Sequence, residues 1–194
     1  ADESAYILSD SGSVVAFAEN EEQVQKLASR REKIPGVRHV VVFDGRPGAD
    51  GWVMTLSQLM ERGREFDAAH PRRFEERARS LRPDMLATLI YTSGTTGLPK
   101  GVELAHDCWV KQAASVDASG VLDHRPILQY FWLPLAHSFG KMIGTAQLRI
   151  GFPTVIDGRI ERIAENLATV RPSFVCAVPR IFEKLHARIL ARVR

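Results

Sequence analysis

The chain has 194 residues, of which 45% are hydrophobic and 25% are charged, so its composition is that of a folded globular domain with a sizeable core. This composition excludes a disordered or fibrous chain. The formal net charge is +3, which is too small to predict nucleic acid as a partner.

The first part of the chain alternates short apolar runs with a helical pattern. Ala5–Leu8 and Val14–Phe17 are predicted as strands on either side of a polar turn. Asn20–Arg31 is predicted as a helix with Asn20 as its N-cap. Val37–Phe43 is nearly all apolar, which is typical of a strand buried in a parallel sheet. The order of strand, helix and strand predicts a sheet with helices packed on it.

A second helix is predicted after a turn rich in glycine and proline at Asp44–Gly51. This helix covers Thr55–Ala69 and has an apolar face. The face would hold Leu56, Leu59, Met60 and Gly63. Pro71–Leu81 carries many charges of both signs, which predicts a solvated helix or a connector.

The second half of the chain continues the alternation of strands and helices. The predicted strands are Ala87–Tyr91, Gly101–Leu104, Ile127–Pro134, Phe152–Ile156 and Phe174–Val178. The predicted helices are Asp107–Val116, Lys141–Ile150, Ile160–Val170 and Arg180–Val193, the first of them capped by Asp107. This order is that of an α/β fold.

The stretch Tyr91–Gly101, with the sequence YTSGTTGLPKG, carries the most specific chemistry of the chain. Its glycines let backbone N–H groups turn toward an anion without a Cβ atom in the way. Further hydrogen-bond donors are the hydroxyl groups of Thr92, Ser93, Thr95 and Thr96. Lys100 adds a mobile positive charge suited to phosphate. These features predict a phosphate-binding loop, with a plain surface turn as the alternative.

The spacing within this stretch is more informative than its composition. Three glycines and one proline at these positions would arise by chance about twice in 100,000 starts. A P-loop needs Gly-Lys followed by Ser or Thr and then a helix, whereas Lys100 follows Pro99 and precedes a predicted strand. A nucleophile elbow needs glycine two residues before the serine, where Tyr91 stands before Ser93. Ser93 is therefore not predicted as a nucleophile.

Residues 91–102, YTSGTTGLPKGV, resemble the signature loop of the adenylate-forming superfamily. This superfamily includes acyl- and aryl-coenzyme A synthetases, luciferases and the adenylation domains of peptide synthetases. Leu133–His137 with Phe139 resembles the superfamily motif near the acyl pocket, and Val178–Lys184 resembles a stretch of long-chain fatty acyl-coenzyme A synthetases. Two further segments that fit this subfamily are Tyr6–Ser11 and Val40–Gly45. The resemblance thus runs across nearly the whole chain.

The resemblance implies that residues 1–194 form an incomplete portion of the layered, large N-terminal AMP-binding domain of such an enzyme. It implies activation of a long-chain fatty acid by ATP through an acyl-adenylate, with Mg²⁺ as the metal and coenzyme A as the acceptor. The ATP phosphates would contact Thr92, Ser93, Gly94, Thr95, Thr96, Gly97 and Lys100. His137 would lie beside the acyl pocket, whereas without the resemblance a core histidine bonded to the backbone is favoured.

Several parts of the family's catalytic equipment are not found in these residues. They are an aromatic-Gly-x-Thr-Glu motif whose Glu helps hold Mg²⁺, a Thr-Gly-Asp motif near the ribose, and a Lys on a small C-terminal domain. We therefore expect residues 1–194 to be an internal part of a longer enzyme, with no complete catalytic set and no metal ligand, and to be inactive alone. Long-chain members often have Phe-Glu-Arg where this chain has Phe139-Gly140-Lys141, so no role for that Glu is carried over.

Two other function classes stay open. One is a different adenylate-forming ligase, such as an aryl-acid ligase or the adenylation domain of a peptide synthetase, and the acid preference of the parent enzyme would separate it from a fatty acid ligase. The other is a non-catalytic nucleotide-binding module, which the absence of the remaining motifs from the parent protein would favour.

The two cysteines, Cys108 and Cys176, have no metal-ligand spacing, and free buried thiols in a reducing compartment are favoured over a disulfide. No apolar run of about 18 residues is present, so no transmembrane helix is predicted. The expected location is the cytoplasm.

A basic stripe recurs every four residues in the last predicted helix, at Arg180, Lys184, Arg188 and Arg192. A solvated stripe is favoured, and peripheral contact with anionic lipid at the inner membrane surface is the alternative. Sheets that lack strands from the rest of the enzyme would leave unpaired edges and uncovered apolar faces. Self-association of the chain is therefore also expected.

Overall fold

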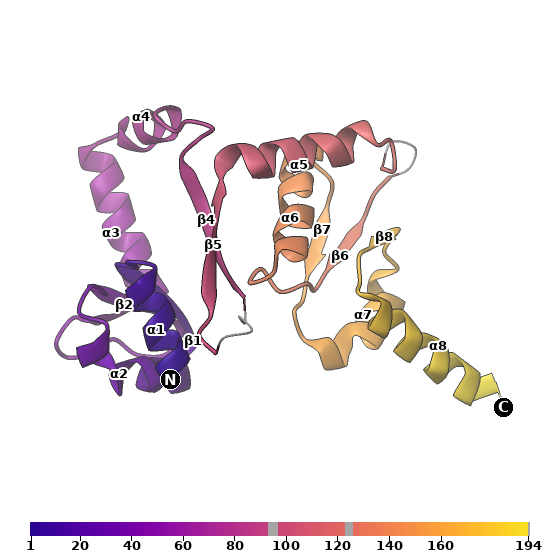
Figure 1. The fold of residues 1–194 in the computed structure, drawn as a ribbon, viewed down its shortest axis with the longest axis horizontal. Coiled ribbons are helices and arrows are strands. Elements are labelled where there is room, and N and C mark those ends of the chain that lie inside the picture. Colours follow the sequence, from indigo (N-terminus) through magenta and orange to yellow (C-terminus); the bar gives the residue numbers. More distant parts are fainter. Residues whose placement is uncertain (93–96, 123–125, 194) are drawn as a thin grey trace. The chain divides into compact units, whose positions relative to one another are not determined.

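The computed structural model of the protein describes residues 1–92, 97–122 and 126–193. The chain divides into two compact units, residues 1–103 and 104–194 (Figure 1). The described strands form three separate sheets, two of three strands and one of two strands. Helices and strands alternate along the chain, which confirms the predicted α/β fold class.

A parallel sheet of three strands forms the centre of the first unit. Its strands are β1 (Val15–Asn20), β2 (His39–Asp44) and β3 (Val53–Thr55). The side chains of the central strand that are fully buried are Val40, Val41 and Val42. The predicted strand at Val37–Phe43 is therefore confirmed as a buried parallel strand, and the strand predicted at Val14–Phe17 corresponds to β1.

The first element of the chain is a helix, α1 (Asp2–Asp10), so the strand predicted at Ala5–Leu8 is wrong. A short apolar run fits a strand or a helix equally well by its pattern alone. Here Ala5 and Leu8, three residues apart, pack on the core of the unit, and such spacing is that of one helical face. The carboxylate of Asp2 lies at the helix start, where it favours the helix and accepts hydrogen bonds from Arg30 and Lys33.

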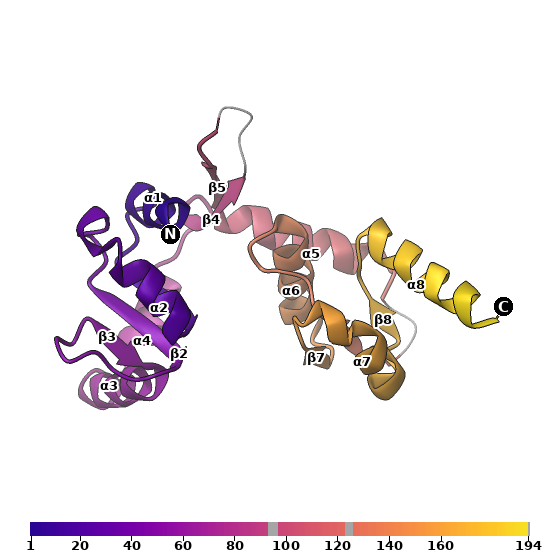
Figure 2. The ribbon, with the colours of Figure 1, turned by 90° about the horizontal axis from the view of Figure 1, so that it is seen from below.

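Helix α2 (Glu21–Ala28) begins at the predicted cap. The side-chain oxygen of Asn20 accepts a hydrogen bond from the backbone N–H of Gln23 at 3.1 Å, which confirms this residue as the N-cap. The helix ends three residues before the predicted Arg31, and a short 3₁₀ helix, η1 (Arg31–Lys33), follows it. Figure 2 shows α2 on one side of the sheet and the next helix, α3 (Leu56–Ala69), on the other.

Helix α3 (Leu56–Ala69) confirms the second predicted helix and begins at a capping box. Thr55 accepts from the backbone N–H of Gln58, and the Gln58 side chain accepts from the backbone N–H of Thr55. The strand β3 directly before it was not predicted, because its three residues adjoin the helical pattern. No residue of α3 is fully buried, so the predicted apolar face is only partly covered. The charged stretch that follows forms an exposed helix, α4 (Arg73–Arg79), as predicted.

Strands β4 (Leu86–Thr92) and β5 (Lys100–Ala105) pair with each other and confirm the predicted strands on either side of the glycine-rich loop. Within this loop, residues 93–96 lie outside the described part of the chain.

The second unit is built around a second parallel sheet. Its central strand is β6 (Gln129–Phe131), with β7 (Thr154–Ile156) and β8 (Phe174–Val175) on its two sides. The three strands predicted here are confirmed but are shorter than expected. The buried core of the unit consists of Tyr130, Phe131, Trp132, Leu133, Ile143 and Ile163.

The helices of the second unit confirm the predicted ones with shifted ends. They are α5 (His106–Ala118), α6 (Ser138–Ile150), α7 (Ile163–Val170), which follows the 3₁₀ helix η2 (Ile160–Arg162), and α8 (Pro179–Val193). Asp107 is not the cap of its helix, because it lies within the first turn of α5 and its carboxylate accepts a hydrogen bond from Lys111 at 2.6 Å.

Both cysteines are free thiols, as predicted, although Cys108 is exposed and only Cys176 is half-buried. None of the described helices is long and apolar enough to cross a bilayer. The basic stripe of α8 stays a prediction, since most of its side chains lie outside the described part of the chain.

An apolar patch is exposed on one face of β1 and β2. Phe17 and Phe43 are 58% and 56% exposed, and their rings stack with centroids 5.9 Å apart. Val15 lies two residues before Phe17 on β1, so its side chain shares that face, and β1 is an edge strand of the sheet. This patch is where the predicted self-association would be favoured.

We expect Phe17→Ser to shift the chain toward monomer, because the substitution removes the most exposed apolar ring beside the open edge. Phe74→Ser is the matched control, since Phe74 is 81% exposed on α4. Light scattering over a range of concentrations measures the effect. A wild-type chain that stays monomeric at every concentration would show that the expectation of self-association is wrong.

Gly140 lies where helix α6 touches the segment that leads into it. A Cβ atom at this position would lie 2.5 Å from the carbonyl oxygen of Pro134, a contact that real Cβ atoms do not make. Gly144, one turn further along α6, has nothing within 4 Å of its ideal Cβ position. The two glycines therefore differ in what a methyl group would meet.

We expect Gly140→Ala to destabilise the protein by about 1 to 3 kcal/mol, because the backbone at Pro134 must move to admit the methyl group. Gly144→Ala should instead stabilise it by up to about 1 kcal/mol through helix propensity. Urea unfolding followed by circular dichroism measures both changes. Equal effects of the two substitutions would contradict the close contact at Gly140.

Candidate functional site

The glycine-rich loop connects the ends of two paired strands. Thr92 is the last residue of β4 and Lys100 the first residue of β5, and both are exposed. Gly97 has a φ of +100°, a backbone conformation that side chains disfavour. Of the predicted phosphate contacts, the four outside the described residues are Ser93, Gly94, Thr95 and Thr96.

The charge of Lys100 is available for an anion. None of the ion pairs found among the described residues involves its ammonium group. Glu103, further along β5, is exposed. Among the described residues, the Lys100 ammonium at the start of β5 thus has no acidic partner at the edge of the loop.

Tyr91 holds the base of the loop from the β4 side. Its hydroxyl donates a hydrogen bond to the carboxylate of Asp10 at 2.6 Å. This bond, followed by partial burial of the ring, raises the pKa of Tyr91 to about 12, so the hydroxyl stays a donor at neutral pH. Asp10 was not predicted, because it is 81 residues away in sequence and only the fold brings it to Tyr91.

His137 lies in the second unit, directly before helix α6. Its side chain is exposed, so the interpretation as a core histidine is wrong. Its backbone N–H donates to the carbonyl of Pro134 at 3.2 Å, and its own carbonyl accepts from Lys141. These bonds fix the backbone at the start of α6. None of the described side chains caps this helix, so the N–H groups of its first turn can donate hydrogen bonds to a ligand.

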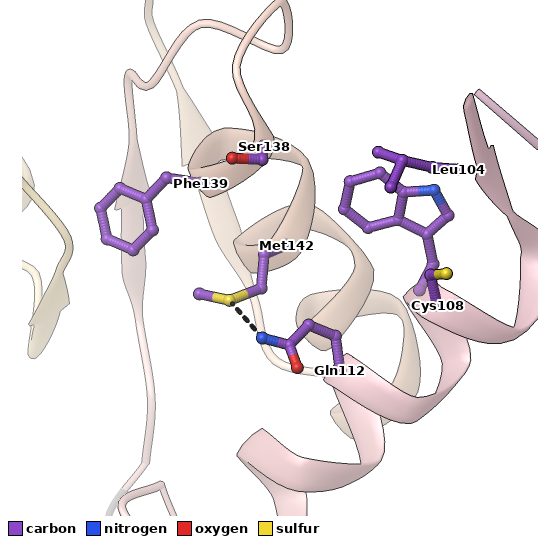
Figure 3. A pocket seen from close by; sticks show the side chains of 7 residues that line it. Leu104, Cys108, Gln112, Ser138, Phe139 and Met142 are labelled. Atoms are coloured by element: carbon purple, nitrogen blue, oxygen red, sulfur yellow. Dashed lines mark hydrogen bonds between the residues drawn. The ribbon is translucent and has the colours of Figure 1, made fainter. Parts of the chain in front are cut away.

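A pocket of about 440 Å³ lies between helices α5 and α6 (Figure 3). The residues that line it are Leu104, Cys108, Trp109, Gln112, Ser138, Phe139 and Met142. The amide of Gln112 on α5 contacts the sulfur of Met142 on α6 at 3.5 Å and links the two walls. Ser138 and Phe139 directly follow His137, so the pocket begins at the histidine motif.

This pocket has the size and lining of a small-molecule site. Its volume falls within the range of ligand pockets, roughly 300–1,000 Å³, and it is mainly apolar with a few polar groups. An apolar chain could lie along Trp109, Phe139 and Met142, with a carboxylate at the uncapped start of α6. The α5 side of the pocket was not predicted, because a helical pattern does not show which neighbour it will face.

The predicted residues fall into two groups. Thr92, Gly97 and Lys100 belong to the first unit, and His137 belongs to the second. In the described part of the chain, no cluster of three or more His, Cys, Asp or Glu side chains could hold a metal ion.

Comparison with known proteins finds relatives of similar sequence and solved structures of similar fold. The long-chain-fatty-acid–CoA ligase FadD15 of Mycobacterium tuberculosis is 32% identical over 192 residues, which are 96% of this chain and 30% of that protein. The chain thus spans less than a third of the length of this relative.

Two solved structures share the fold at low sequence identity. The A domain of carboxylic acid reductase from Segniliparus rugosus, in complex with AMP and a co-purified carboxylic acid, has a TM-score of 0.71 at 22% identity, over 99% of this chain and 33% of that one. O-succinylbenzoate coenzyme A synthetase from Bacillus subtilis, in complex with ATP and magnesium ion, has a TM-score of 0.61 at 19% identity, over 95% of this chain and 33% of that one.

The chain also matches the model of a protein family. The match covers residues 1–193, and the family is described as AMP-binding enzyme. This confirms the resemblance found at the loop and at the histidine motif. The chain therefore belongs to the family of AMP-binding enzymes.

Proposed function

We propose that this chain is part of a ligase that activates a long-chain fatty acid with ATP, through an acyl-adenylate, and passes the acyl group to coenzyme A. The observation that carries the proposal is the apolar pocket lined by Ser138 and Phe139, directly after His137, in a chain of the AMP-binding enzyme family. The relative named above as a long-chain-fatty-acid–CoA ligase supports the choice of acid. In this proposal residues 1–194 alone bind polyphosphate weakly at best and do not catalyse the reaction.

ATP is held by the loop between β4 and β5 in this proposal. The phosphate contacts are Thr92, Ser93, Gly94, Thr95, Thr96, Gly97 and Lys100. The uncompensated ammonium of Lys100 and the left-handed backbone at Gly97 support it, because a glycine-rich turn and a lysine suit a polyphosphate. Mg²⁺ would neutralise charge on the ATP phosphates, and in this family a Glu of a motif not found in these residues helps to hold it.

The fatty acid lies in the pocket between α5 and α6. Its carboxylate is placed at the uncapped N-terminus of α6 beside His137, where backbone N–H groups favour negative charge. Its alkyl chain contacts Trp109, Phe139 and Met142, which removes apolar surface from water. The residues of this chain thus bind and orient the acid for attack on the α-phosphate, and positioning supplies much of the rate in such reactions.

Carboxylate-dependent ATP–pyrophosphate exchange tests the function, with acids from acetate to oleate. We propose that a longer protein containing this chain exchanges and prefers long acids, while residues 1–194 alone do not exchange. Exchange by residues 1–194 alone would contradict their proposed inactivity. A preference for aryl or amino acids would favour another adenylate-forming ligase, and no exchange by the longer protein with any acid would favour a non-catalytic nucleotide-binding module.

Lys100→Gln should weaken the binding of ATP to this chain by about tenfold or more, because a charge-assisted contact to phosphate is lost. Lys26→Gln is the matched control, since it removes the same charge from an exposed pair with Glu22 on α2. Isothermal titration calorimetry at fixed salt measures both affinities. Equal affinities of the two variants would show that Lys100 does not contact the nucleotide.

Met142→Trp should weaken the binding of palmitate by about tenfold and that of hexanoate much less, because the larger ring fills the pocket between the helices. Leu148→Trp is the matched control on the same helix, where Leu148 is 81% exposed and lies outside the pocket. Calorimetric titration with acids of increasing length measures the effect. An equal loss in both variants would mean that the acyl chain binds elsewhere.

A further inference from the structure

The side chain of Tyr91 connects three segments of the first unit. It stands on β4, one residue before the loop, and its hydroxyl donates to Asp10 at the end of α1. Its ring also lies against Gly101 on β5, where a Cβ atom would come within 3.0 Å of the ring carbon that carries the hydroxyl. One tyrosine therefore contacts the strand that leaves the loop and bonds to a helix outside it.

We propose that the Tyr91–Asp10 hydrogen bond positions the two ends of the loop, Thr92 and Lys100, for the phosphates of a nucleoside triphosphate. The inference rests on the proposed function and names two positioning residues for it. Thr92 follows Tyr91 directly and Lys100 precedes Gly101 directly, so a shift of the tyrosine ring moves both ends together. Preorganised ends bind a ligand more tightly, because less ordering is left for the moment of binding.

The Tyr91–Asp10 hydrogen bond lies outside the hydrophobic core that stabilises the first unit. Tyr91 does not belong to the buried cluster of the first unit, which is centred on Val40 and Val42. Its bond to Asp10 lies at the exposed surface, where hydrogen bonds add little to the stability of a fold. The bond is therefore better suited to orienting the loop than to stabilising the sheet.

The negative charge of Asp10 and its hydrogen bond to Tyr91 are expected to affect nucleotide binding in opposite directions. A carboxylate near a phosphate-binding loop repels the ligand, so its charge alone would weaken nucleotide binding. The structure gives this carboxylate the hydroxyl of Tyr91 as its hydrogen-bond donor. A pure charge effect and a positioning effect consequently predict opposite results when Asp10 is replaced.

The test measures the affinity of the whole 194-residue chain for ATP by calorimetry, with thermal unfolding of each variant alongside. Tyr91→Phe and Asp10→Ala should each weaken ATP binding about five- to tenfold, and the double variant should bind no more weakly than either one, because both lose the same bond. Asp10→Asn should restore most of the affinity, since its amide oxygen still accepts from the hydroxyl. Asp67→Ala, an exposed carboxylate on α3, is the control for charge and should change nothing.

The outcomes separate the inference from the function on which it rests. ATP binding by Asp10→Ala that equals or exceeds the wild-type affinity would overturn the positioning role and leave only repulsion. Additive losses in the double variant, or losses that follow a lowered unfolding temperature, would also overturn it. No binding of ATP by the wild-type chain would instead refute the proposed nucleotide site, and the inference with it.

Discussion

Two parallel sheets, each with one strand buried on both faces, form the centres of their units. In the first unit this strand is β2, where Val40, Val41 and Val42 have no exposed surface. In the second it is β6, where Gln129 and Tyr130 are 1% exposed. Parallel strands must be joined by crossovers, so the chain has to leave each sheet at one edge and return over its face. The histidine motif lies on such a crossover, directly after β6.

The pocket depends on how closely this crossover approaches the helix that follows it. Gly140 lets the first turn of α6 rest on the carbonyl of Pro134. That contact sets the direction of α6 and thereby places Ser138, Phe139 and Met142 along one wall, opposite the residues of α5. A substitution at Gly140 that moved this contact would therefore change the wall of the pocket.

The sequence could predict the features that depend on local patterns and could not predict those that depend on contacts. The sequence predicts the buried strand at Val37–Phe43 and the cap at Asn20, because buried strands and helix caps have characteristic residues within a short stretch of sequence. The run at Ala5–Leu8 was assigned to the wrong element, since its apolar residues suit either structure until the core they contact is known. No local sequence pattern indicates that Asp10 bonds to Tyr91 or that α5 forms a wall of the pocket. Only the fold brings Asp10 to Tyr91 and α5 to α6.

The same reasoning explains why a departure from the family pattern can be tolerated here. Long-chain acyl-coenzyme A synthetases often carry Glu where this chain has Gly140. In this structure no side chain fits at that position without moving the backbone at Pro134, because the Cβ atom itself would overlap the carbonyl oxygen. An acid there would need a wider separation between the histidine segment and α6, and hence a differently shaped wall at Phe139. The glycine at position 140 and the close contact between α6 and the Pro134 carbonyl are therefore expected to change together.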